Sequence, residues 1–298
     1  MSVIISIMDK FWSFVGKEDQ KRLATLPEPE GVVRITDLCY LEDGDPMHML
    51  DVYYPDGTNA PLPVIIDVHG GGWMYGDKEL NRLYCLTLAK RGYTVFNMSY
   101  RLVPQVTVDE QIRDVMCALQ WIQAHLGDYP AQPDKIMLTG DSAGGFLAAY
   151  AAALLSSKAL RSVFDTVDCD LKLTMLALTS PVAYMDDKGY MGVYTRKMWG
   201  DDYKRKPTAP YMNVSAMLRA GKMPPTFLVT SSGDFMALKQ TRRLAHELEG
   251  KGVDVDFMEF PTFEGEDLPH VFSVIYPDNK PGRLTIDRML NMFTRVNK

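Results

Sequence analysis

A regular alternation of short apolar runs and helix-like segments restricts the fold of this chain more than any other feature. The apolar runs, each typical of a buried strand, are "PLPVIIDVHG", "YTVFNMSY", "KIMLTG", "LKLTMLALTSP", "PTFLVTSSGD" and "VDVDFMEFP". Helical periodicity covers 79–91, 112–126, 143–156, 237–249 and 284–296. This order predicts an α/β fold, with a mainly parallel central sheet and helices on both faces. Functional residues of such sheets lie in loops at the carboxyl ends of the strands.

Two segments stand outside this alternation. An extended pair, 32–40 and 49–54, precedes it and is joined through the turn "DGDP". Residues 181–225 hold no strong strand pattern, are rich in Tyr, Met, Lys and Pro, and are too long for a plain connection. They predict small helices near the functional site, as a lid or specificity insert. Because no linker separates this insert, we expect residues 1–298 to form a single domain with a small lid.

The N-terminal stretch "MSVIISIMDKFWSFVGKED" has the pattern of an amphipathic helix. Its apolar residues fall at positions 4, 7, 8, 11, 12 and 15. A signal peptide is not indicated, because a basic n-region is missing and Asp9 and Lys10 interrupt the apolar run. We expect an N-terminal cap helix within residues 1–30. Its apolar face could pack on the domain, cover a pocket as a mobile cap, or contact a membrane surface.

Composition narrows the classes of partner. A net charge of −6 offers no basic footprint for nucleic acid. Stable membrane insertion is not expected, because no stretch reaches the ~20 apolar residues of a spanning helix. The four cysteines are scattered without a C-x-x-C, which predicts free thiols and a reducing, cytoplasmic location. No histidine pair has metal-ligand spacing and no dinucleotide fingerprint occurs, so neither a metal nor a cofactor is expected.

Ser142 lies in "GDSAGG", directly between a predicted strand and a predicted helix. One interpretation is a helix start, because Ser and Asp are favoured there. The other is a nucleophile on a tight strand–turn–helix elbow, which matches the pattern G-x-S-x-G. Gly140 and Gly144 would remove the side chains that clash in such a turn, whereas two glycines that open a helix are costly for a mere cap.

The segment "HGGGW", His69–Trp73, follows the strand Val64–Val68. Three successive glycines leave backbone N–H groups free to approach a ligand. Acyl transfer needs such donors where negative charge develops on the carbonyl oxygen. A flexible turn is the plainer interpretation. A phosphate loop is excluded, because Asp77 separates Gly76 from Lys78 and no Ser or Thr follows.

An acid and a base follow two later strands. Asp234 ends "TFLVTSSGD", and His270 is the one histidine that comes after a late strand. A serine hydroxyl needs an imidazole to take its proton and a carboxylate to hold that imidazole in the right tautomer. The order Ser142, Asp234, His270 is the one expected when the nucleophile sits on an elbow. Other acids close to this histidine in sequence are Glu264, Glu266 and Asp267.

These motifs together resemble the α/β-hydrolase fold, in its hormone-sensitive-lipase-like carboxylesterase branch. The resemblance covers about Val32 to the C-terminus and is carried by "HGGGW", "SYRLVPQ", "GDSAGG", "PPTFLVTSSGD" and "PHVF". Within the branch, "HGGGWMYGDK" is similar to bacterial esterases of the feruloyl and acetyl-xylan type, and also to formamidases with H-G-G-x-W. The chain departs from the family at Val103 and Gln105, where Ala and Glu are common, and in a longer loop between Gly265 and His270.

The resemblance implies an acyl-enzyme on Ser142, with His270 as base and then acid. It also implies an oxyanion hole from the N–H groups of Gly71, Gly72 and Ala143, and a substrate pocket lined by Trp73. The expected activity is that of a serine carboxylesterase for short acyl chains. The alternatives are an amidase or arylformamidase with the same residues, and a non-catalytic ligand-binding protein on a hydrolase scaffold. The expected partner is a small ester, and a homodimer is plausible.

Overall fold

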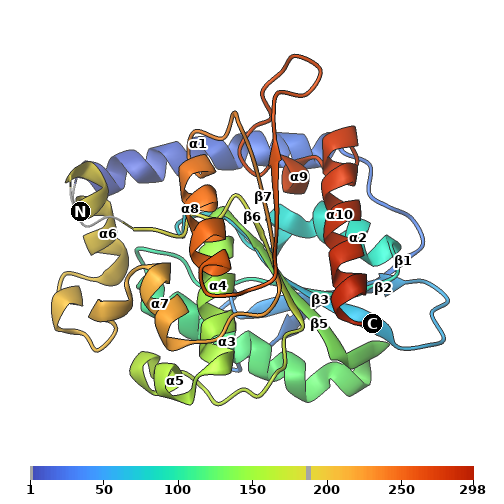
Figure 1. Ribbon diagram of the computed structural model, residues 1–298, viewed down its shortest axis with the longest axis horizontal. Coiled ribbons are helices and arrows are strands. Elements are labelled where there is room, and N and C mark those ends of the chain that lie inside the picture. The colour runs from blue at the N-terminus through green and yellow to red at the C-terminus, as the bar shows by residue number, and fades with distance from the viewer. Residues whose placement is uncertain (1–2, 186–188) are drawn as a thin grey trace.

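An eight-stranded sheet forms the centre of the molecule in the computed structural model, which describes residues 3–185 and 189–298 (Figure 1). Its strands are β1 (Val32–Cys39), β2 (Met49–Pro55), β3 (Leu62–Val68), β4 (Thr94–Met98), β5 (Ala131–Asp141), β6 (Met175–Thr179), β7 (Thr226–Ser231) and β8 (Val255–Phe260). The order across the sheet is β1-β2-β4-β3-β5-β6-β7-β8. The N-terminal extended pair therefore lies at one edge, beside β4.

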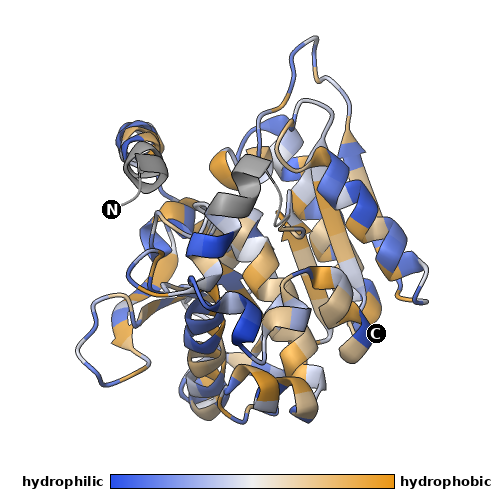
Figure 2. Cartoon of the chain, turned by 90° about the vertical axis from the view of Figure 1, so that its left-hand side faces the viewer, coloured by the Kyte–Doolittle hydropathy of each residue, from blue (hydrophilic) through white to orange (hydrophobic). Residues whose placement is uncertain are grey.

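The sheet is mainly parallel, as the sequence predicts. β2 pairs antiparallel with both β1 and β4, and the remaining neighbouring strands pair in parallel. Every residue of β4, β6 and β7 is buried, because helices cover both faces. This explains why these strands are continuous apolar runs and do not alternate with polar residues. Figure 2 shows the central strands in orange beside helices that carry blue residues as well.

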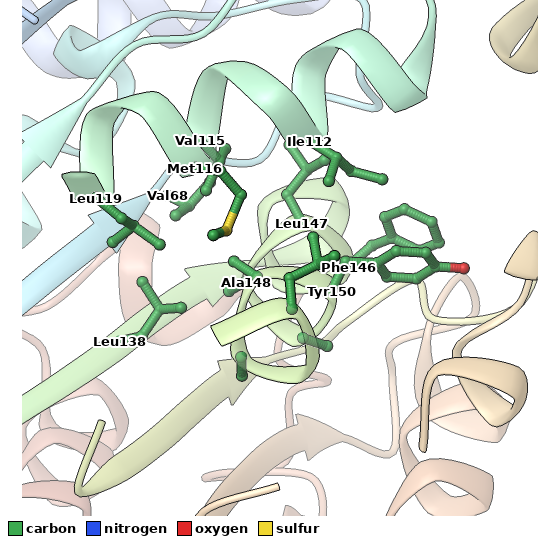
Figure 3. Packing of buried hydrophobic residues seen from close by; sticks show 14 of the residues in the cluster. Val68, Ile112, Val115, Met116, Leu119, Leu138, Phe146, Leu147, Ala148 and Tyr150 are labelled. Atoms are coloured by element: carbon green, nitrogen blue, oxygen red, sulfur yellow. The ribbon is translucent and has the colours of Figure 1, made fainter. Parts of the chain in front are cut away.

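The helices form one layer on each face of the sheet. They are α2 (Arg82–Lys90), α3 (Val108–His125), α4 (Ser142–Ser156), α5 (Lys158–Phe164), α8 (Leu238–Glu249), α9 (Phe272–Ile275) and α10 (Lys280–Val296). Apolar residues of α2, α9 and α10 belong to one buried cluster, and those of α3, α4 and α8 belong to the other. Figure 3 shows the second cluster where Ile112 and Met116 of α3 meet Leu147 of α4.

The structure adds detail at three places where it departs from the predicted helices. A short 3₁₀ turn, η1 (Lys78–Asn81), replaces the first turn of the helix expected from residue 79. The last helix begins at Lys280, four residues before the predicted start, because Asn279 caps it and Pro281 occupies its first turn. Helix α5 follows α4 almost at once, since the Ser157 side chain caps a new helix just after the first one ends.

The insert 181–225 folds into short helices, as predicted. It contains α6 (Gly189–Trp199), α7 (Val214–Ala220) and the 3₁₀ turns η3 (Tyr203–Arg205) and η4 (Ala209–Tyr211). Residues 186–188 of this expected lid lie outside the described residues. α7 packs against α4, so the insert lies beside the helix that starts at Ser142.

The N-terminal segment forms α1 (Val3–Thr25), in agreement with its helical pattern. Figure 1 shows α1 lying across the end of the molecule from which α8 and α10 start, which is the carboxyl-end edge of the parallel strands. Among the described residues, no helix combines the length and the apolar character needed to cross a bilayer. Helix α1 therefore covers the edge at which α/β proteins carry their functional sites.

Candidate active site

Ser142 occupies the sharp turn between β5 and α4. Its φ is +50°, in the left-handed region that only a tightly held non-glycine residue adopts. A Cβ on Gly144 would lie 2.0 Å from the Val68 carbonyl oxygen, and one on Gly140 would lie 2.6 Å from the Gly144 carbonyl oxygen. Glycines at these two positions therefore allow the elbow to close, as the sequence predicts.

The helix-start interpretation does not account for the polar side chains of the elbow. Asp141 occupies the N-cap position of α4 but makes no capping hydrogen bond. Its carboxylate instead accepts from Gly70 N (3.0 Å) and from Asn81 Nδ2 (2.8 Å). The Ser142 hydroxyl turns to another partner, His270, so neither side chain serves as a cap.

Ser142, His270 and Asp234 form one hydrogen-bonded chain. Ser142 Oγ lies 2.9 Å from His270 Nε2, and His270 Nδ1 lies 3.0 Å from both carboxylate oxygens of Asp234. Asp234 is completely buried, whereas Ser142 is 7% exposed. The three residues lie in the segments that follow β5, β7 and β8, and the sheet brings them together at its carboxyl edge.

Asp234 is held as an ionised hydrogen-bond acceptor. Burial raises the pKa of its carboxyl group, but the hydrogen bond and charge of His270 outweigh burial and leave the pKa below its usual range. The backbone N–H groups of Met236 and Ala237 donate to Oδ1 at 3.1 and 2.9 Å, and the Thr230 hydroxyl donates to Oδ2 at 3.2 Å. These bonds orient the carboxylate toward the imidazole.

The long loop before His270 is anchored close to that residue. Backbone hydrogen bonds between Phe263 and Glu266 close the loop on itself at its tip, which projects at the top of Figure 1. Beyond the tip, the Ser231 hydroxyl donates to the Leu268 carbonyl oxygen at 2.7 Å. The competing acids Glu264, Glu266 and Asp267 are exposed, and His270 pairs with Asp234.

The glycine loop presents backbone N–H groups beside the elbow. Gly71 and Gly72 have φ of +105° and +57°, and a Cβ on Gly71 would lie 2.0 Å from the Tyr75 carbonyl oxygen. In the described part of the chain, neither glycine N–H has a backbone or side-chain acceptor. Ala143 is the second residue of α4, so its N–H also lacks an acceptor within the helix. Among the described residues, none of the three N–H groups predicted as oxyanion donors has a hydrogen-bond acceptor.

Side chains from three elements fix the carbonyl groups of this loop. The bonds run from the Tyr100 hydroxyl to His69 O (2.8 Å), from Gln111 Nε2 to Trp73 O (2.8 Å) and from the Tyr194 hydroxyl to Gly72 O (2.6 Å). Burial lowers the pKa of His69 to about 4, so its ring is neutral at ordinary pH. Its Nδ1 lies 2.8 Å from the Gly70 carbonyl oxygen, and the ring stacks on Tyr100, so His69 has a structural position.

A cavity of about 180 Å³ opens beside the serine, and α1 forms one of its walls. The wall residues Phe11, Trp12 and Val15 come from α1, and the opposite side includes Gly71, Ser142 and His270. The N-terminal helix α1 therefore lies over a pocket beside Ser142, as in one of the three interpretations of its apolar face.

Two contacts attach α1 to the body of the molecule near this cavity. The Trp12 ring stacks on Tyr75, with 5.9 Å between ring centroids, and the Tyr75 hydroxyl donates to Asp19 at 3.2 Å. Arg22 donates to the Ile275 carbonyl oxygen at 2.8 Å. The helix is therefore held at its middle and toward its C-terminal end.

Trp73 lies outside this cavity. It is 3% exposed and packs edge-on against Phe146 and Tyr194, with centroid separations of 5.6 and 6.5 Å. Its predicted place in a substrate pocket stays a prediction.

Sequence reasoning places Trp12 on the apolar face of the N-terminal helix, but it does not bring Trp12, Tyr75 or Tyr194 to the glycine loop. The signals for two of them were present, since Trp12 lies on the apolar face of the N-terminal pattern and Tyr194 lies in the Tyr-rich insert. Neither signal says which distant segment the residue will contact.

The fold and site together have the form of a serine hydrolase built on a parallel α/β sheet. The BD-FAE family model matches residues 50–188. A crystal structure of inhibited esterase B from Lactobacillus rhamnosis is 32% identical, covers 99% of this chain and 97% of its own, and superposes with a TM-score of 0.92. The chain therefore belongs to the carboxylic ester hydrolases of the α/β-hydrolase fold.

Further relatives are esterases as well. Another structure of esterase B, inhibited by a tributyrin phosphonate, is 32% identical over 98% of this chain and 95% of its own, with a TM-score of 0.92. The probable carboxylic ester hydrolase LipM of Mycobacterium tuberculosis is 34% identical over 135 residues, 44% of this chain and 31% of LipM. The matches span between 22% and 62% of the curated relatives' own lengths.

Proposed function

We propose that this chain hydrolyses esters of short acyl chains through an acyl-enzyme on Ser142. The observation that carries the proposal is the unbroken hydrogen-bonded chain from Ser142 Oγ through His270 to Asp234. Such a chain gives a weak hydroxyl nucleophile a base within reach and gives that base a fixed orientation. No metal and no cofactor take part in the proposed reaction.

In the first step, His270 Nε2 removes the proton from Ser142 Oγ while that oxygen attacks the ester carbonyl carbon. The carbonyl π electrons move onto the oxygen, and the unpaired N–H groups of Gly71, Gly72 and Ala143 stabilise its charge. The tetrahedral intermediate then collapses, the C–O bond to the alcohol breaks, and the imidazolium returns its proton to the leaving alkoxide. Water repeats the sequence on the acyl-enzyme and releases the carboxylic acid.

A preference for short acyl chains is supported by the cavity and by one relative. The cavity beside Ser142 is about 180 Å³, and Trp12 and Val15 of α1 help to bound it. Esterase B is inhibited by a tributyrin phosphonate, which carries butyryl groups. We extend that acyl size to this chain as part of the proposal.

The test is the hydrolysis of p-nitrophenyl esters from acetate to palmitate by wild type and by Ser142→Ala. We expect activity to fall with chain length and to drop by about 10⁴–10⁶-fold in kcat in the variant. Ser156→Ala, at the opposite end of α4, is the matched control and should retain wild-type activity. An aryl formamide in the same series tests the amidase alternative, and a fluorophosphonate label on Ser142 tests the non-catalytic one. Equal rates in wild type and Ser142→Ala would contradict the proposal.

The remaining features of the proposal concern organisation and location. We propose that residues 1–298 act as one domain, with 1–30 as a cap and 181–225 as a lid that reaches the glycine loop through Tyr194. A cytoplasmic location is supported by four free cysteines, of which Cys85 and Cys169 are buried. The partner is a small ester. In this proposal the chain neither binds nucleic acid nor inserts stably into a membrane. Sedimentation would test whether it forms a homodimer.

A further inference from the structure

Asn81 joins two buried carboxylates beside the proposed oxyanion hole. Its Nδ2 lies 2.9 Å from Asp67 Oδ2 and 2.8 Å from Asp141 Oδ1. All three side chains are buried, with exposures of 2%, 1% and 4% for Asn81, Asp67 and Asp141. A side-chain amide has two hydrogens to donate, and Asn81 donates one to each acid.

No lysine or arginine in the described residues pairs with either carboxylate. Two acids that share a site without a cation cannot both ionise cheaply. Burial, followed by the charge of Asp141, raises the pKa of Asp67 to about 8. The pair therefore keeps one proton at neutral pH, carried by Asp67. Other titratable groups that face the pair are Cys85 and Tyr84 from α2, Tyr100 after β4, and His270 across the site.

Asp141 connects the two segments that supply the proposed oxyanion donors. Its Oδ1 accepts from Gly70 N at 3.0 Å in addition to Asn81. Gly70 precedes the donors Gly71 and Gly72 on the loop, and Asp141 lies two residues before the donor Ala143 on the elbow. The spacing between these donors therefore depends on the Asp141 carboxylate, and Asn81 sets the position of that carboxylate.

We propose that Asn81 is a positioning residue for ester hydrolysis, which holds the glycine loop and the nucleophile elbow at the spacing the oxyanion requires by donating to the side chains of Asp67 and Asp141. This inference rests on the proposed function. It has a geometric reason, because oxyanion donors must lie 2.7–3.1 Å from the developing charge. Loss of the amide removes the hydrogen bonds that join the two acids, and ionisation of Asp67 adds a second negative charge beside Asp141.

The first experiment compares Asn81→Ala with Asn97→Ala, using p-nitrophenyl butyrate. Asn97 is a matched control, because it is also fully buried and donates from Nδ2 to the Lys78 carbonyl oxygen (2.7 Å) in the same 3₁₀ turn, η1. Asn97 is the neighbour of Asp67 across β3 and β4, but among the described residues its amide donates to the Lys78 carbonyl oxygen and not to either carboxylate. We expect Asn81→Ala to lower kcat by about 10–10²-fold with KM changed by less than about threefold, in line with misplaced oxyanion donors. Asn97→Ala should keep kcat within about threefold of wild type.

The second experiment measures kcat against pH for wild type and Asp67→Asn. In wild type, Asp67 loses its proton as the pH rises through about 8, and the second charge then opposes Asp141. We expect a fall of kcat in that pH range for wild type and no such fall for Asp67→Asn, whose neutral amide cannot ionise. If Asp67 had only a structural role, Asp67→Asn would change stability but would leave the fall of kcat near pH 8 as it is in wild type.

Two outcomes would overturn the inference. One is an equal loss of kcat in Asn81→Ala and Asn97→Ala, which would make the amide a support of η1 only. The other is an alkaline limb that is the same in wild type and Asp67→Asn. Failure of the proposed function is a distinct result, because Ser142→Ala would then hydrolyse the ester as fast as wild type.

Discussion

Gly72→Ala tests whether α1 is packed directly on the glycine loop. Gly72 has φ of +57°, a conformation that costs an alanine about 1–2 kcal/mol. The added Cβ would lie 2.1 Å from Trp12 Cζ2, where atoms in contact are normally about 3.5–4 Å apart. The Trp12 ring must therefore shift and give up its stacking on Tyr75, which is worth about 0.5–1.5 kcal/mol. We expect a total loss of about 2–4 kcal/mol in the free energy of unfolding.

The assay is urea unfolding of wild type, Gly72→Ala, Trp12→Ala and the double variant. Trp12→Ala removes the ring that the new methyl group meets, so the double variant should be more stable than the sum of the single losses by about 1–2 kcal/mol. Gly57→Ala is the control for conformation alone, since Gly57 has φ of +68° and no atom within 4 Å of an added Cβ. Losses that simply add, or a Gly72→Ala loss no larger than that of Gly57→Ala, would refute the packing of Trp12 on Gly72.

Three further predictions concern the acid, the elbow and the buried pair. Asp234→Asn should lower kcat by about 10⁴-fold, whereas Asp267→Asn should leave kcat near wild type, as measured by steady-state kinetics on one ester. A large loss of kcat in Asp267→Asn would instead make Asp267 the partner of His270. Gly144→Ala, with its Cβ 2.0 Å from the Val68 carbonyl oxygen, should cost more than about 4 kcal/mol, and an unchanged melting temperature would contradict the elbow geometry. Burial raises the pKa of Asp67 from 3.8 to about 8, so wild type should lose stability as the pH rises through that window while Asp67→Asn does not. The Tm of Asp67→Asn should thus equal that of wild type near pH 4 and exceed it most at pH 8. A difference in Tm that does not change with pH would contradict the raised pKa of Asp67.

The residues that carry the chemistry could be located from the sequence because each depends on local constraints. Ser142 needs glycines two positions to either side for its turn to close, and a short pattern records that need. Asp234 and His270 follow strands of a parallel sheet, whose carboxyl ends meet at one edge whatever the loops contain. Chain order then distinguishes this constellation from other arrangements of the same residue types.

The walls and supports of the site could not be located in this way. Trp12 and Tyr75 are more than sixty positions apart in sequence and meet only because α1 crosses the sheet edge. Asn81 falls in a segment whose sequence predicts an ordinary helix, yet it is the last residue of the 3₁₀ turn η1 and faces two acids. Its role depends on which carboxylates the folded sheet brings near it, and no local pattern encodes that.

The projecting hairpin before His270 separates two tasks that a shorter loop would combine. Its tip is closed by hydrogen bonds between Phe263 and Glu266, and Ser231 then takes hold of the chain at Leu268 before the imidazole is reached. The tip residues Glu264 and Gly265 are exposed and lie outside the sheet. Insertions or deletions at the tip can therefore accumulate without displacing His270, which makes this hairpin a natural place for the chain to vary in length or to accept a grafted peptide.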